Sequence, residues 1–109
     1  MIFDYFSRIE FRVTSMLVGV MTAQLHMQGI ASLKAKRSIV KGLIGRLKSR
    51  FNVSVSEVDE QDIKTSAVIG IAIVCNERRF IDRQFDSIIN FMQNDGRFYL
   101  GQVERETFS

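Results

Sequence analysis

The stretch SAVIGIAIVC, residues 66–75, carries the strongest strand pattern in the sequence and decides the fold. Side chains alternate between the two faces of a strand. One face carries Ala67, Ile69, Ile71, Ile73 and Cys75, and the other carries Val68, Gly70, Ala72 and Val74. Because both faces are apolar, the stretch is typical of a strand in the middle of a sheet.

Three further strands are predicted on either side of this one. MLVGVMTAQLHM at residues 16–27 is apolar and partly alternating, and NVSVSEVD at residues 52–59 and RFYLGQVERE at residues 97–106 also have strand character. Val58 falls on the opposite face from the other valines of its strand. Either a bulge intervenes there or the strand ends early.

Two stretches place apolar residues at helical spacing. The stripe of the first, at residues 33–51, is Leu33, Val40, Leu43, Ile44, Leu47 and Phe51. The stripe of the second, from residue 77 to about 94, is Phe80, Ile81, Phe85, Ile88, Ile89 and Met92. Ser32 and Asn76 precede these helices and are predicted to cap them. Asn52 is placed for a left-handed exit from the first helix.

The order βαββαβ predicts an α+β, ferredoxin-like fold: a four-stranded antiparallel sheet with two helices on one face. Right-handed crossovers place the strands at 16–27 and 66–75 in the middle. Two helices cover only one face, so the second apolar face needs a partner subunit, residues 1–15 or a ligand to cover it. The alternative is that its small residues tolerate water.

Composition predicts one domain in a reducing compartment. The 109 residues are 46% hydrophobic and 25% charged, as is ordinary for a globular protein. A single cysteine, Cys75, forms no internal disulfide and no multi-thiolate metal site, which fits the cytosol. No apolar run approaches the roughly 20 residues that span a bilayer. We therefore expect a cytoplasmic protein that does not enter the membrane.

Residues 1–15 are predicted to be an N-terminal leader or extension, ahead of a single ferredoxin-like domain at residues 16–109. Met16 is an alternative start immediately before a strand. The other interpretation is a short docking helix, since apolar residues recur at helical spacing through this segment.

A family resemblance rests on three motifs. They are Ser32-Leu33-Lys34 with Lys36-Arg37, then FNVSV at residues 51–55, then Glu57-Val58-Asp59 with Gln61-Asp62. With these motifs the chain resembles the YlxP-like family of small bacterial proteins from Leu17 to about Glu106. The resemblance implies a ferredoxin-like fold and no established activity. The family's genes are often found among those for transcription and translation factors, which implies a connection with RNA or the ribosome.

The chain departs from this family at two positions. Gln28 stands where the family tends to have proline, and Ile63 where an aromatic residue is usual. The loop before the first helix and the hairpin after Asp62 are therefore expected to differ in shape from those of the family.

The first helix carries seven basic residues between Lys34 and Arg50 and no acidic residue, although the net charge of the chain is only +3. At about 100° per residue, Lys34, Lys41 and Lys48 share the side opposite the apolar stripe, and Lys36 lies closer to that stripe. Cations near a helix N-terminus oppose the helix dipole. We therefore predict contacts with nucleic-acid phosphates. The predicted set is Lys34, Lys36, Arg37, Lys41, Arg46 and Lys48.

Two polar clusters lie near this helix. Gly29 and Ser32 are predicted as an anion site at free backbone N–H groups, the alternative being plain capping by Ser32. The alternative to phosphate binding is a solvated face balanced by acids, namely Glu57, Asp59, Glu60 and Asp62. These acids lack the spacing of a calcium loop, so ion pairs to the helix or a polar hairpin are expected, and no metal site.

No catalytic constellation is present. His26 and Cys75 lack the partners of a nucleophilic site and are expected to be structural. Acylphosphatases share the topology but need an arginine in the loop after strand one, and QGIAS, residues 28–32, has none. We expect no enzymatic activity and no cofactor.

Base stacking on the sheet is not expected, because the two central strands contain no phenylalanine or tyrosine. Phe98 and Tyr99 belong to an edge strand. The expected function is a cytosolic RNA- or ribosome-associated binding module whose basic helix contacts phosphates. The alternative is a homodimeric scaffold that pairs through the open sheet face and binds no nucleic acid.

Overall fold

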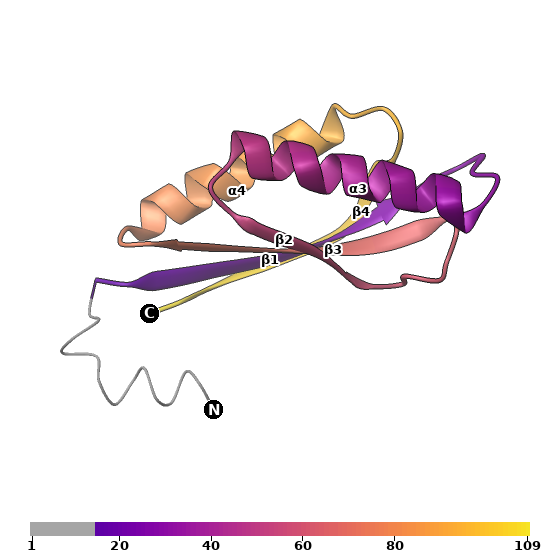
Figure 1. The fold of residues 1–109 in the computed structure, drawn as a ribbon. Helices are drawn as coiled ribbons and strands as arrows, with labels where there is room; N and C mark the ends of the chain where they lie inside the picture. Colours follow the sequence, from indigo (N-terminus) through magenta and orange to yellow (C-terminus); the bar gives the residue numbers. More distant parts are fainter. Residues whose placement is uncertain (1–14) are drawn as a thin grey trace.

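A computed structural model of the chain describes residues 15–109 (Figure 1). The element order is β1 (Leu17–His26), α3 (Leu33–Arg50), β2 (Ser54–Asp59), β3 (Ser66–Cys75), α4 (Arg78–Gln93) and β4 (Tyr99–Phe108). This is the predicted ferredoxin-like order, with boundaries within two residues of the expected ones. The predicted leader or docking helix at residues 1–15 falls almost wholly outside the described residues, so the domain division stays a prediction.

The strands form one antiparallel sheet in the order β2-β3-β1-β4. As predicted, the two most apolar strands are central, and their register runs from Leu17 opposite Cys75 to His26 opposite Ser66. Both helices lie on the same side of this sheet (Figure 1). None of the helices in the described range is long and apolar enough to cross a membrane.

The core fills the space between the sheet and the helices. β3 contributes Ile69, Ile71 and Ile73, and α4 contributes Ile81, Phe85, Ile88 and Met92, all at most 3% exposed. Gly19 of β1 lets α4 approach closely, because a Cβ there would lie 2.5 Å from Ile81 Cγ2. A side chain at this position would force the overpacked core to shift.

The other face of the sheet carries Val68, Gly70, Ala72 and Val74 of β3, as the alternation predicted. Val74 is 62% exposed. Of the two alternatives for β2, a bulge or an early end, the structure has the bulge, because the register shifts between Glu57 and Asp59. It turns Val58 onto the open face above Gly70, where a Cβ would lie 2.8 Å from Val58 Cγ1.

Of the three predicted capping residues, one is confirmed. Ser32 caps α3, its Oγ accepting from the Ala35 N–H at 3.1 Å. Asn76 does not cap α4: Glu77 holds that position without a side-chain bond, and its carbonyl accepts from Phe80 and Ile81. The left-handed exit at Asn52 is also wrong. Phe51 leaves α3 in extended conformation at φ −128°, and the Val53 N–H satisfies its carbonyl.

Candidate nucleic-acid interface

Helix α3 separates its residues into two faces. Val40, Leu43 and Leu47 are buried in the core. Five basic residues of α3 are exposed, and four of them stand ahead of its last residue, Arg50: Lys34, Arg37, Lys41 and Lys48. We call these four the basic ribbon. Lys34 and Lys48 stand fourteen residues apart in α3, a rise of about 21 Å at 1.5 Å per residue.

The basic ribbon is only weakly neutralised. With the residues that the structure describes, Lys34, Lys41 and Lys48 form no ion pair. Arg37 Nη2 lies 3.8 Å from Asp62 Oδ1, and the two side chains are 59% and 92% exposed. A pair so long and so exposed contributes little to stability and leaves Arg37 able to exchange partners.

Lys36 does not belong to the phosphate-contacting set, which corrects the sequence prediction. Its side chain is fully buried, and its Nζ lies 3.1 Å from Glu57 Oε2. The same Nζ donates to the carbonyls of Glu60 at 2.5 Å and Gln61 at 3.3 Å. Lys36 follows the apolar side of α3 and reaches the β2–β3 turn, so it cannot reach a ligand outside.

The acidic cluster serves the same turn. The Glu60 carboxylate accepts from Gln24 Nε2 at 3.1 Å and from Ser66 Oγ at 2.8 Å. Asp59 Oδ1 accepts from the Glu60 N–H at 2.8 Å. Glu60 has φ 59°, and among described residues other than glycine it is the only one with positive φ. The expected ion pairs are confirmed for Glu57 and Asp62, and the described part of the chain holds no group of three potential metal ligands.

The predicted anion site at Gly29 and Ser32 stays a prediction. Gly29 adopts φ 69°, which bends the chain ahead of α3. Ser32 has the capping role that was the alternative interpretation. Both residues are exposed at the N-terminal end of the ribbon.

Arg46 lies on the side of α3 that faces α4 and is held by Asp95. Its Nη2 is 2.6 Å from Asp95 Oδ2, and Arg97 Nε is 2.7 Å from Asp95 Oδ1. The Asp95 side chain is only 5% exposed, against 39% for Arg46. Arg46 therefore ties α3 to the turn after α4.

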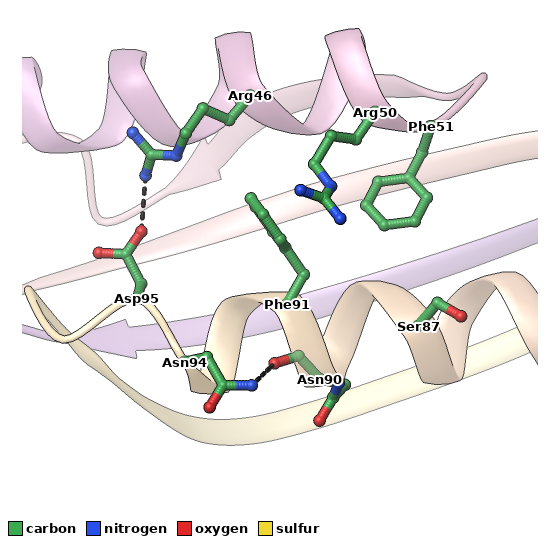
Figure 2. Close-up of a pocket in the computed structure, with 8 residues that line it drawn as sticks. All are labelled: Arg46, Arg50, Phe51, Ser87, Asn90, Phe91, Asn94 and Asp95. Carbon is green, nitrogen blue, oxygen red and sulfur yellow. Dashed lines mark hydrogen bonds and ion pairs between the residues drawn. The ribbon is translucent and has the colours of Figure 1, made fainter.

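A groove of about 660 Å³ opens between α3 and α4 (Figure 2). Its α3 side consists of Arg46, Arg50 and Phe51, and its α4 side of Ser87, Asn90, Phe91, Asn94 and Asp95. The Arg50 guanidinium carbon lies 4.8 Å from the centre of the Phe91 ring. Phe51 meets the same ring edge-on, with centroids 6.1 Å apart.

This groove is not predicted from the sequence, because its two sides lie about forty positions apart in the chain. One signal was present. Phe91 is the aromatic residue of the second helix that falls outside the predicted apolar stripe. An aromatic side chain off the stripe is expected either in solvent or against a neighbouring element, and here it meets α3.

The remaining candidate residues lie on the sheet. His26 stacks on Tyr99, with ring centroids 5.2 Å apart, and Gly101 leaves the space for the imidazole. Phe98 is buried and Tyr99 is 54% exposed. Cys75 packs half-buried against the core, with its Sγ donating to the Glu77 carbonyl at 3.2 Å. These contacts agree with the structural roles expected for His26 and Cys75.

Comparison with known proteins gives one family. The family model described as "Protein of unknown function (DUF503)" matches residues 18–105. "Uncharacterized protein YlxP" of Bacillus subtilis (strain 168) is 28% identical over 78 residues, which are 72% of this chain and 85% of that protein. The solved structure of the de novo designed protein Foldit4 is similar at a TM-score of 0.51 and 16% identity, covering 86% of this chain and 97% of that one, which shows the fold alone. The chain therefore belongs to the DUF503 family, as its resemblance to YlxP-like proteins implied.

Proposed function

We propose that this protein is a cytosolic binding module for RNA, free or in the ribosome, that holds backbone phosphates on the basic ribbon. The observation that carries the proposal is the exposed charge of Lys34, Lys41 and Lys48, which no described carboxylate neutralises. Lys36, Arg46, Arg83, Arg97 and Arg105 form ion pairs, whereas Arg50, Lys64, Arg78 and Arg79 are exposed without one among the described residues. The ribbon differs from these four because its unpaired cations recur along one helix.

Helix stability does not account for the ribbon. Lys34 and Arg37 stand in and just after the first turn of α3, which contains no acid, so they oppose the positive end of the helix dipole. A row of phosphates would compensate this charge. Contacts of this kind position an RNA without reading its bases. The genomic neighbourhood implied by the family resemblance supports the same partner.

The test is a triple charge reversal, Lys34→Glu with Lys41→Glu and Lys48→Glu, measured by RNA titration in increasing salt. Four phosphate contacts give a slope of log affinity against log salt near about −3 for single-stranded RNA, and one remaining contact gives roughly −1. The matched control reverses Arg78, Arg79 and Arg83 on α4, with the same change in net charge. The proposal would be contradicted if the ribbon variant kept the RNA affinity and salt dependence of the wild type. It would also be contradicted if both quantities fell equally in the α4 control variant.

A second candidate function is supported by the open sheet face. Val74 and Val58 are 62% and 50% exposed there. We propose that a second copy of the chain covers this face in a homodimer, with or without RNA. Light scattering at micromolar concentration should show a dimer that Val74→Lys converts to a monomer. A wild-type monomer at that concentration would exclude this interface.

A further inference from the structure

We infer that the groove between α3 and α4 holds one unpaired nucleotide of the RNA whose phosphates lie on the basic ribbon. The inference rests on the proposed function and adds a base-binding site to it. Three features of the groove support it: a stacking surface, free amide groups and a net positive charge (Figure 2).

The stacking surface is the pair Arg50 and Phe91. Arg50 lies over the Phe91 ring at 4.8 Å from its centre, and Phe51 supports that ring from the side. Arg50 is exposed and forms no ion pair with any described residue. Unpaired bases stack on guanidinium planes and aromatic rings alike, so a surface of this kind suits any of the four bases.

The amide groups stand on the α4 side. Asn94 Nδ2 donates to the Asn90 carbonyl at 2.8 Å, which leaves Asn94 Oδ1 as an acceptor. The side-chain amide of Asn90 forms no hydrogen bond with the described residues. An asparagine amide presents a donor beside an acceptor, and this arrangement matches the N6 and N7 edge of adenine. The groove therefore favours adenine over a base without that edge.

The charge of the groove disfavours a cationic ligand. Among the described residues that line it, Asp95 is the only carboxylate, and this group already holds Arg46 and Arg97. Arg50 adds a further positive charge. Arg50 is also two residues beyond Lys48, the last residue of the ribbon. At about 100° per residue these two side chains stand about 200° apart around α3, so a strand that follows the ribbon crosses the end of α3 to reach the groove.

The first experiment uses free nucleotides, followed by NMR of the asparagine side-chain amides. Adenosine 5′-monophosphate should shift the signals of Asn90 and Asn94. Ribose 5-phosphate at the same concentration has the phosphate without the base and should leave them in place. Equal shifts with the two compounds would mean that the groove binds phosphate only, which overturns the inference.

The second experiment compares two RNA oligomers of ten nucleotides, one of adenosines and one with abasic sites throughout. Wild type should prefer the adenosine oligomer at least about fivefold, the lower end of what one stacked base contributes. Arg50→Lys keeps the charge and the side-chain stem but loses the planar group. It should remove the preference while leaving affinity for the abasic oligomer within about twofold, since the phosphate contacts are unchanged.

The two proposals fail separately. If wild type binds both oligomers equally while the triple reversal of Lys34, Lys41 and Lys48 weakens both, the groove inference is wrong and the proposed function stands. If the base preference persists but the triple reversal changes nothing, the ribbon is not the phosphate site and the proposed function is wrong.

Discussion

Lys34 and Lys36 stand in the same turn of α3 and carry the same charge, but their surroundings differ completely. Lys36 is fully buried, with its Nζ 3.1 Å from Glu57 Oε2 and bonded to two carbonyls of the β2–β3 turn. Lys34 is exposed and pairs with no described carboxylate. One lysine belongs to the fold, and the other is left available for a ligand.

The difference shows how a basic residue can be assigned to structure or to binding. A buried charge is tolerated only when partners compensate its desolvation, so every contact of Lys36 is needed by the fold. An exposed charge near a helix N-terminus gives no such benefit and slightly opposes the helix. Stability therefore explains Lys36 and does not explain Lys34.

The largest expected effect is that of Lys36→Met. It removes the cation while Glu57 Oε2 stays buried, an oxygen with no hydrogen-bond partner beyond the ion pair. Breaking one side of a buried pair destabilises a protein by about 3–5 kcal/mol. Urea unfolding followed by circular dichroism would measure this as a lower midpoint at unchanged slope.

Lys34→Met is the matched control for that experiment. The same substitution at an exposed position should change the free energy of unfolding by no more than about 0.5 kcal/mol. If Lys36→Met and Lys34→Met lowered the free energy of unfolding equally, the two lysines would contribute equally to stability despite their different burial.

The sequence predicted more of the fold than of the site. Alternation in residues 66–75 and the two apolar helical stripes were sufficient for element order, sheet order and the two faces of β3. Helical geometry also placed Lys36 toward the apolar side. Its full burial depends on Glu57 and on the carbonyls of Glu60 and Gln61, which lie 21 to 25 positions away on the two sides of the β2 bulge. Local sequence patterns do not extend over 21 to 25 positions, so they could not predict these contacts.

The groove between α3 and α4 could not be predicted from the sequence for the same reason. Arg50 and Phe91 meet only because α3 and α4 pack side by side on the sheet. The capping prediction at Asn52 failed as well. Asn52 does not have positive φ, and the residue before it, Phe51, is extended and packs edge-on against Phe91.

Arg46 is partly exposed like Lys34 and ion-paired like Lys36. The substitution Asp95→Asn tests whether its role is in the fold or in binding. Asp95 is nearly buried while its two arginines are about 40% exposed. Charged hydrogen bonds in a buried setting contribute about 1.5–3 kcal/mol each, and exposure of the arginines reduces this, so a loss of about 1–2 kcal/mol is expected. Thermal unfolding would measure it.

Affinity for RNA gives the second half of that test. Without its carboxylate, Arg46 becomes free to contact phosphate, and binding should strengthen while stability falls. Weaker binding would show that Asp95 is needed to shape the groove. Unchanged stability would place Arg46 with the exposed lysines.

The smallest expected effect comes from comparing Lys34→Glu with Lys48→Glu. An acid near the N-terminus of α3 favours the helix dipole, and an acid in its last turn opposes it, each by about 0.3–1 kcal/mol at low salt. Lys34→Glu should therefore stabilise the protein and Lys48→Glu should destabilise it, although both should weaken RNA binding because both remove a ribbon cation. If the two variants change stability in opposite directions and both weaken RNA binding, the effect of charge on the helix is distinct from its effect on phosphate contact. If affinity instead follows stability, the ribbon acts through folding and not through contact with phosphate.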